Sequence, residues 1–270
     1  MTANIYEAIR AAGLAPAKEL DLPDGKLVRY RVAGDKGGSR NGWAVCYGDA
    51  GSFGSWKTGE SHTWHAQSST PQTPAERAAL QQQIKALQQA RAEEQATVHE
   101  SARKRAARLW ALAKPANNAH PYLQRKRVPA YGIRQLRQML VIPARDTIGV
   151  LHTLQFISED GSKRFLTGGR IAGCYFSIGR PFDQLLITEG LATASTLYQA
   201  TGIATAVCFS CGNMGPVARA LRVKYPRLRL TLCADNDFKT PGNPGVTHAR
   251  AAAQAVDGFL AVPQFAEVAP

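Results

Sequence analysis

Residues 183–263 alternate short apolar runs with helical patterns, and this alternation constrains the fold more than any other feature of the chain. The apolar runs lie at 185–187, 204–209, 228–234 and 259–263. Short apolar runs bounded by turn residues are typical of buried strands. The sequence therefore predicts an α/β fold with a mostly parallel sheet.

Acidic residues directly follow two of these predicted strands. Glu189 follows the first strand, and Asp235 and Asp237 follow the third. Open α/β sheets bind ligands beyond the carboxyl ends of their strands, so we expect the three carboxylates at one edge. In an extended segment side chains alternate, so Asp235 and Asp237 point to the same side and Asn236 points away.

Three carboxylates at one edge repel each other unless a cation joins them. Hard oxygen ligands select Mg²⁺ or Mn²⁺ rather than zinc. A magnesium ion held by carboxylates and substrate phosphates is usual in phosphoryl and nucleotidyl transfer. The alternative is that each acidic residue is only a helix N-cap or loop residue, but three in this register favour a metal site.

The segments Thr188-Glu189-Gly190 and Ala234-Asp235-Asn236-Asp237 resemble the Toprim domain, a family of primases, topoisomerases and OLD-type nucleases. The stretches 190–194 and 210–215 are most similar to the primases of plasmids and phages. The resemblance covers roughly residues 121–263. It implies a DNA primase that uses Mg²⁺ or Mn²⁺. Its catalytic and metal-binding residues would be Glu189, Asp235 and Asp237. Alternatively, Glu189 would act as the general base. The resemblance also places Asn213 at the nucleotide.

Most of the positive charge precedes the acidic segment. Residues 100–180 hold 15 Lys and Arg against 4 Asp and Glu, which is +11 of the net charge of +13. A basic block beside a metal-carboxylate cluster favours a nucleic-acid partner, because phosphates need neutralising where the chemistry occurs. The alternative is a solvated basic face.

Residues 117–181 are predicted to be β-rich, with strands at 140–142 and 150–157 and a hairpin at Asp160-Gly161. This order resembles the N-terminal half of the bacterial replicative primase's RNA polymerase domain. The resemblance implies that Lys163, Arg164 and Arg170 bind nucleic acid or NTP, and Arg145 matches less closely.

Two departures from the bacterial primase pattern stand out. That pattern has a further Asp where this chain has Thr193, which implies fewer metal ligands. It also has an acidic pair further downstream, whereas this sequence stops at Pro270. We therefore expect a chain truncated from a larger protein, with a helicase part or a replicative helicase as partner beside single-stranded DNA and NTPs.

The predicted organisation has four parts. They are an N-terminal α+β module (1–66), a linker and long helix (67–116), the basic β-rich primase subdomain (117–181) and the Toprim domain (182–270). The helix begins with a capping box at Thr73, Pro74 and Glu76 and runs without Pro or Gly to about Lys114. Its last part carries a basic face.

The module at 1–66 interleaves aromatic residues with Arg29, Arg31, Arg40 and Lys57. Such a surface could stack bases beside phosphate contacts, or its three tryptophans could form the core. Both interpretations stay open at this point. The module lacks the two close Cys or His pairs of a zinc ribbon, so we expect it to fold without zinc around a Trp/Tyr/Val core.

No apolar run approaches eighteen residues and no signal peptide is evident, so we expect a cytoplasmic protein without a membrane span. The five cysteines are scattered, and the CxxC at 208–211 is expected to hold inert thiols. Two rival functions remain: a Toprim-type metal-dependent nuclease with water as nucleophile, and a non-catalytic single-stranded-DNA-binding module that uses the basic block alone. A topoisomerase is disfavoured because no tyrosine-bearing cleavage domain is recognisable.

Overall fold

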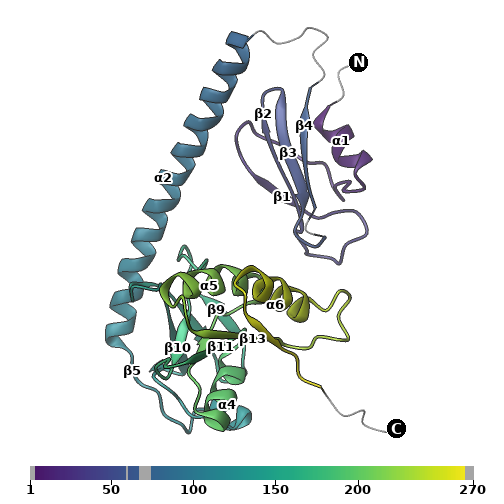
Figure 1. Ribbon diagram of the computed structural model, residues 1–270. Coiled ribbons are helices and arrows are strands. Elements are labelled where there is room, and N and C mark those ends of the chain that lie inside the picture. Colours follow the sequence, from purple (N-terminus) through teal and green to yellow (C-terminus); the bar gives the residue numbers. More distant parts are fainter. Residues whose placement is uncertain (1–3, 59, 67–73, 265–270) are drawn as a thin grey trace. The chain divides into compact units, whose positions relative to one another are not determined.

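The computed structural model describes residues 4–58, 60–66 and 74–264 (Figure 1). The chain divides into two compact units, Met1–Glu94 and Gln95–Pro270. Each unit has a hydrophobic core of its own.

The first unit contains one short helix, a four-stranded antiparallel sheet in the order β1-β2-β3-β4 and the first part of the long helix α2 (Pro74–Leu112). The elements are α1 (Ile5–Ala11), β1 (Val28–Tyr30), β2 (Gly42–Tyr47), β3 (Ala50–Ser55) and β4 (Ser61–His65). A capping box formed by Asn4 and Glu7 begins α1. The predicted α+β composition of this module is confirmed.

The core of this unit is aliphatic and aromatic, but tryptophan is largely absent from it. It is built from Ile5, Ile9, Leu14, Leu20, Tyr30, Val32, Ala44 and Phe53. Trp56 is 61% exposed, Trp43 is partly exposed, and only Trp64 packs partly against the core. Of the expected Trp/Tyr/Val core, Tyr30 and Val32 are present, whereas Trp43 and Trp56 lie outside it, because strand alternation turns Trp43 to the face opposite Ala44.

The predicted long helix is present as α2 (Pro74–Leu112), 39 residues without a break. Thr73, its predicted N-cap, lies outside the described residues. Near its C-terminal end Ala102 and Ala106 are buried, while the predicted basic face between Arg103 and Arg108 is exposed. Among the described helices, this one included, none is long and apolar enough to cross a membrane.

The second unit opens with a five-stranded antiparallel sheet in the order β5-β6-β7-β8-β9. Its elements are β5 (Lys114–Pro115), α3 (Pro121–Lys126), β6 (Arg134–Leu136), β7 (Met139–Arg145), β8 (Leu151–Ile157) and β9 (Lys163–Phe165). The predicted strands and the hairpin at Asp160-Gly161 are present, so the β-rich character of this segment is confirmed.

A second five-stranded sheet follows, in the order β10-β12-β11-β13-β14. Its elements are β10 (Phe176–Ile178), β11 (Gln184–Thr188), α4 (Leu191–Thr201), β12 (Thr205–Val207), α5 (Cys211–Lys224), β13 (Arg229–Cys233), α6 (Pro244–Ala255) and β14 (Phe259–Ala261). Only β10 pairs antiparallel, so the predicted mostly parallel sheet is confirmed. The helical pattern after the second apolar run predicts a helix from about Met214 to Tyr225, but α5 already begins at Cys211.

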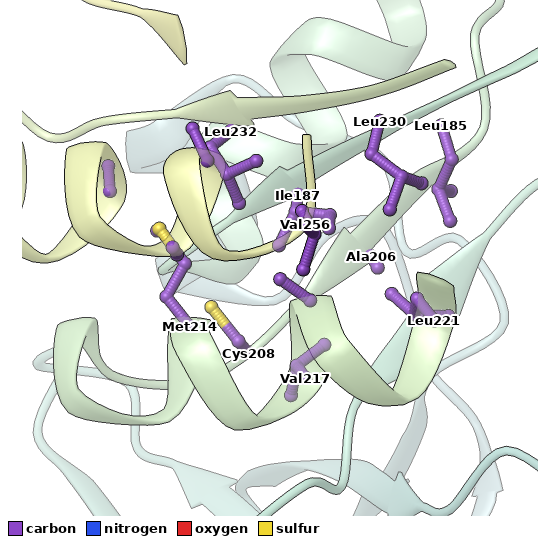
Figure 2. Packing of buried hydrophobic residues seen from close by; sticks show 14 of the residues in the cluster. Leu185, Ile187, Ala206, Cys208, Met214, Val217, Leu221, Leu230, Leu232 and Val256 are labelled. Carbon is purple, nitrogen blue, oxygen red and sulfur yellow. The ribbon is translucent and has the colours of Figure 1, made fainter. Parts of the chain in front are cut away.

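Helices cover both faces of the parallel sheet. On one face α5 and α6 pack Met214, Leu221 and Val256 against Ile187 and Leu232 (Figure 2). On the other face Leu191 and Ala194 of α4 share a core with strands β7 and β8 of the antiparallel sheet. This common core fixes the antiparallel sheet against the parallel one.

Candidate active site

Glu189 is the first residue after β11 and lies at the carboxyl edge of the parallel sheet. Its carbonyl accepts a 2.8 Å hydrogen bond from the backbone N–H of Phe209, which follows β12. Its carboxylate accepts a hydrogen bond from the backbone N–H of Cys211, in the first turn of α5. The early start of α5 therefore brings a helix N-terminus to this carboxylate.

Phe209 adopts a left-handed backbone conformation, with φ of 72°, which non-glycine residues rarely adopt. Its ring packs edge-on against Phe165 of β9, with centroids 5.5 Å apart. Residues in such strained conformations persist only where the surrounding structure holds them in place, and they cluster at functional sites. Here the strain occurs directly beside Glu189.

Asp235 and Asp237 lie in the loop that follows β13, where amide side chains hold the backbone. The Asn243 side chain accepts from the Asp237 N–H at 3.0 Å and donates to the Asn236 side chain at 2.8 Å. Gly245, in the first turn of α6, packs so closely that a Cβ there would lie 2.2 Å from the Asp235 carbonyl oxygen. The site therefore requires glycine at this position.

Side chains from two other elements complete the cluster. The Thr193 hydroxyl of α4 hydrogen-bonds to Asp235. The Lys163 ammonium of β9 lies near enough to stabilise the charged forms of both Glu189 and Asp235. The antiparallel sheet thus supplies a cation to the carboxylate edge of the parallel sheet.

The electrostatics of the cluster are those of uncompensated negative charge. Burial raises the pKa of Glu189, and the charges of Asp235 and Asp237 raise it further. Burial, followed by the charge of Asp237, likewise raises the pKa of Asp235. Lys163 opposes both shifts but does not cancel them, so the cluster favours an additional cation.

The donor set at this edge consists of carboxylate oxygens, which suit a hard divalent cation. Within the described residues, no group of three His, Cys, Asp or Glu side chains is close enough together to hold a metal ion. Any divalent cation at this edge would therefore need further ligands from substrate or water oxygens, as catalytic magnesium ions commonly do.

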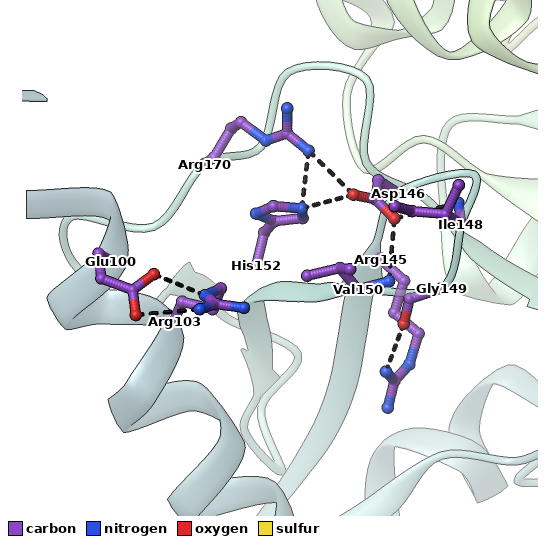
Figure 3. Close-up of polar contacts among 9 residues, drawn as sticks. All are labelled: Glu100, Arg103, Arg145, Asp146, Ile148, Gly149, Val150, His152 and Arg170. Atoms are coloured by element: carbon purple, nitrogen blue, oxygen red, sulfur yellow. Dashed lines mark hydrogen bonds and ion pairs between the residues drawn. The ribbon is translucent and has the colours of Figure 1, made fainter. Parts of the chain in front are cut away.

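The remaining basic residues singled out by the sequence lie elsewhere. Arg170 contacts the Asp146 carboxylate at 3.5 Å and Nε2 of His152 at 2.7 Å, while that nitrogen lies 2.8 Å from Asp146 (Figure 3). One imidazole nitrogen cannot both donate to Asp146 and accept from Arg170, so the tautomer of His152 selects between these contacts. Arg170 is thus held in a polar cluster rather than at Glu189.

Arg145 and Arg164 lie in two further places. Arg145 lines a cleft of about 360 Å³ with Trp110 and Lys224, and it donates to the Gly149 carbonyl at 2.9 Å. Arg164 follows Lys163 on a strand and so points to the opposite face, over the ring of Phe156. Of the four predicted basic residues, the structure therefore brings only Lys163 to the carboxylates.

Asn213 is buried, and backbone groups occupy its amide. It accepts from the Gly173 N–H at 2.9 Å and donates to the carbonyls of Cys174 and Cys208. These bonds tie the segment before β10 to the end of β12. In this structure the side chain positions two backbone segments instead of facing outward.

Sequence reasoning missed several residues of the cluster. The Cys211 N–H could not be assigned because the start of α5 was predicted too late. Gly245 carried no local signal, because its role is a close approach between segments distant in sequence. Thr193 was noted only as a departure from the primase pattern, and its contact with Asp235 shows that the position belongs to the cluster.

Comparison with known proteins links this geometry to a group of relatives. Two curated proteins from Escherichia coli, both named DNA primase TraC, are 36% identical to the chain, each over 96% of its length. The chain spans only 26% and 19% of the lengths of these relatives. No family model matches the chain.

Solved structures give a weaker likeness. The primase fragment of the bacteriophage T7 primase-helicase protein has a TM-score of 0.40 and 13% identity, covering 53% of this chain and 64% of that one. The DnaG primase catalytic domain bound to single-stranded DNA has a TM-score of 0.36 and 14% identity, covering 50% of this chain and 47% of that one. The relationship therefore rests on the sequence relatives: over nearly its whole length, this chain is related to proteins named DNA primase TraC, which confirms the predicted resemblance to primases.

Proposed function

We propose that this chain carries the catalytic part of a DNA primase, which synthesises short RNA primers on single-stranded DNA. The observation that carries the proposal is the cluster of Glu189, Asp235 and Asp237, where burial, followed by the neighbouring negative charges, raises the pKa of Glu189 and Asp235. The sequence relationship to DNA primase TraC over 96% of the chain supports the same activity.

Within this proposal, the parallel strands from β11 onward and their helices form a Toprim domain at 182–270. Strands β6 to β9 belong to a basic primase subdomain at 117–181, which also contributes β10 as the antiparallel edge strand of the other sheet. The linker and long helix at 67–116 join these to the N-terminal module at 1–66. Lys163 supports this arrangement, because it reaches the carboxylates from the neighbouring sheet.

Glu189, Asp235 and Asp237 would hold Mg²⁺ or Mn²⁺. When bound, the metal supplies positive charge that favours the deprotonated primer 3′-hydroxyl and the leaving pyrophosphate. Thr193 orients Asp235 by its hydrogen bond, and the Cys211 N–H orients Glu189. Glu189 is alternatively the general base.

Lys163 would bind the triphosphate of the incoming NTP, because it is the basic side chain that lies at the cluster. Arg145, Arg164 and Arg170 lie away from the cluster, so their proposed role is to contact the template strand. Asn213 is better assigned to positioning the segment before β10. A replicative helicase, or a helicase part of a longer protein, remains the proposed further partner, and the proposed location is the cytoplasm.

The test is a primer-synthesis assay with the purified chain, single-stranded DNA and labelled NTPs, resolved by product length. We expect short RNA products with Mg²⁺ or Mn²⁺ and none with a chelator. Asp235→Asn should abolish these products. Asp183→Asn is the matched control, because Asp183 is exposed and precedes the opposite end of β11.

Two results would overturn the proposal. Metal-dependent shortening of the DNA without new RNA would identify a nuclease. Binding of the strand with no chemistry under any metal, and with no effect of Asp235→Asn, would identify a binding module.

A further inference from the structure

The antiparallel sheet of the first unit has one face covered by α1 and a second face that carries exposed tryptophan. Ile5 of α1 packs against the covered face, so closely that a Cβ at Gly51 would lie 2.6 Å from it. On the opposite face Arg29, Trp43 and Gly54 lie side by side in register across β1, β2 and β3. This second face will be called the tryptophan face.

Two indole rings form the centre of the tryptophan face. The ring of Trp43 lies over Gly54, where a Cβ would meet it at 2.8 Å. The ring of Trp56 lies beside it, with centroids 5.8 Å apart and planes inclined by 38°. Trp56 is 61% exposed, which is unusual for the side chain that buries the most apolar area.

A basic pocket adjoins the tryptophan face. It has a volume of about 580 Å³ and is lined by Lys18, Arg29, Arg31 and Arg40, against the acidic Glu19 and Asp21. Arg29 belongs to both features, and its guanidinium is fixed by hydrogen bonds of 2.9 and 3.1 Å to the Arg40 carbonyl. Residues 1–66 as a whole are almost neutral, with 8 Lys and Arg against 7 Asp and Glu, so this excess of cations is local.

Other acidic groups near Trp56 have partners. Asp35 binds the Lys57 ammonium at 2.6 Å, and this hydrogen bond, followed by one from Asn41, lowers the pKa of Asp35. Glu60 is hydrogen-bonded by Thr58 at 2.6 Å and lies 3.2 Å from His62. An approaching polyanion would therefore meet neutralised carboxylates beside the tryptophans, and in the pocket four cationic side chains against two acidic ones.

We propose that the tryptophan face and the basic pocket together bind single-stranded nucleic acid. Bases stack on Trp56 and Trp43, and the sugar-phosphate backbone runs along Arg29, Arg31 and Arg40. Aromatic platforms beside basic grooves bind single strands in this way, because every base has a face that can stack. Identifying the strand as the primase template rests on the proposed function, whereas the binding itself does not.

The test measures binding of the whole chain to a fluorescent single-stranded oligonucleotide in the presence of a chelator, which separates binding from chemistry. We expect Trp56→Ala to raise the Kd about tenfold, because it removes the aromatic ring on which one base stacks. Trp56→Phe should recover most of the affinity. Arg31→Ala combined with Arg40→Ala should weaken binding and reduce its salt dependence. DNA and RNA oligonucleotides form separate arms, because the stacking surface by itself accepts both.

Matched controls come from the same unit. Lys26→Ala removes an exposed cation outside the pocket, and Trp64→Phe alters the tryptophan that packs toward the core. Both should bind within about twofold of the unaltered chain, and circular dichroism should be the same for all variants. A photo-crosslinking oligonucleotide should attach within residues 42–57.

A Kd for Trp56→Ala within twofold of the unaltered chain would overturn the proposal. The tryptophan face would then be interpreted as a surface for a protein partner. Asp237→Asn separates this inference from the proposed function. If Trp56→Ala weakens binding while no chain synthesises primers, only the proposed function fails. If Asp237→Asn abolishes synthesis while Trp56→Ala binds normally, only the present inference fails.

Discussion

Two acidic sites in the second unit face opposite electrostatic conditions. At the carboxylate cluster, burial and neighbouring negative charge raise the pKa of Glu189 and Asp235. At Asp146, burial also acts to raise the pKa, but hydrogen bonds from His152, Val150 and Ile148 outweigh it and lower the pKa. A carboxylate whose charge is stabilised by hydrogen bonds typically has a structural role. A group of carboxylates with raised pKa values at a sheet edge is typical of a ligand site.

The difference arises from where each carboxylate lies. Asp146 is in a tight turn between β7 and β8, so the backbone N–H groups of Ile148 and Val150 point at it. Glu189 directly follows β11 and Asp235 lies in the loop after β13, and these parallel strands bring like charges to one edge. The turn stabilises its own carboxylate, whereas the sheet edge leaves its carboxylates dependent on a cation.

The largest expected effect is on synthesis. Glu189→Gln and Asp237→Asn should each reduce primer synthesis at least about a hundredfold, because each removes a negative charge from the proposed metal site. Circular dichroism should show the fold unchanged, since neutralising one of several repelling carboxylates does not destabilise. Near-normal synthesis by either variant would show that the site is assigned wrongly.

The second effect is on stability and falls at the other site. Asp146→Ala removes the acceptor for two backbone N–H groups and for His152, at a cost of about 1–3 kcal/mol. Thermal unfolding should therefore begin several degrees lower than in the unaltered chain. An unchanged melting temperature would mean that the turn holds without its carboxylate and that the contrast between the sites is weaker than described.

The third effect is a dependence on pH with opposite signs at the two sites. A carboxyl group whose folded pKa is raised contributes stability below its unfolded pKa, and this contribution is lost as the pH rises through the folded pKa. Glu189→Gln should thus raise the melting temperature of the metal-free protein at neutral pH by about one degree. This gain should vanish in acid, where Glu189 itself is protonated. For Asp146 the sign is reversed, because its folded pKa is lowered. This carboxylate stabilises the fold at pH values above its unfolded pKa, and that stabilisation is lost as the pH falls through the folded pKa.

Unfolding of the metal-free protein followed by calorimetry between pH 4 and 8 would measure both trends. The Asp183→Asn variant provides the control for a carboxylate outside both sites. If Glu189→Gln lowers the melting temperature at neutral pH, the cluster is not under the repulsion inferred here.

The smallest effect separates two neighbouring basic residues. Lys163→Ala should weaken NTP use, because its ammonium lies at the carboxylates, whereas Arg164→Ala should leave NTP use nearly unchanged. For single-stranded DNA, each lost phosphate contact should reduce the slope of log K against log salt by about 0.7. An unchanged slope in the variant that combines Lys163→Ala with Arg164→Ala would place the DNA path elsewhere, such as the exposed basic face between Arg103 and Arg108.

Periodicity in the sequence predicted most of the second unit. The apolar runs at 185–187 and 228–234 correspond to β11 and β13. A strand buried on both faces is a continuous apolar run, so it can be recognised without knowing what packs against it. The same reasoning placed Glu189 and Asp235 at the ends of those strands. In the first unit, composition predicted the strands but left open whether tryptophan lies in the core or on the surface.

The sequence by itself determined the α/β alternation, the long helix and the position of each carboxylate at a strand end, because these follow from local spacing. The tertiary structure alone decided which basic residue joins the carboxylates, since Lys163 and Arg164 are adjacent in sequence and point to opposite faces. It also decided the side of the sheet on which Trp43 and Trp56 lie, and the need for glycine at position 245 beside Asp235. These properties depend on the distance between segments far apart in the chain, and no local pattern encodes such a distance.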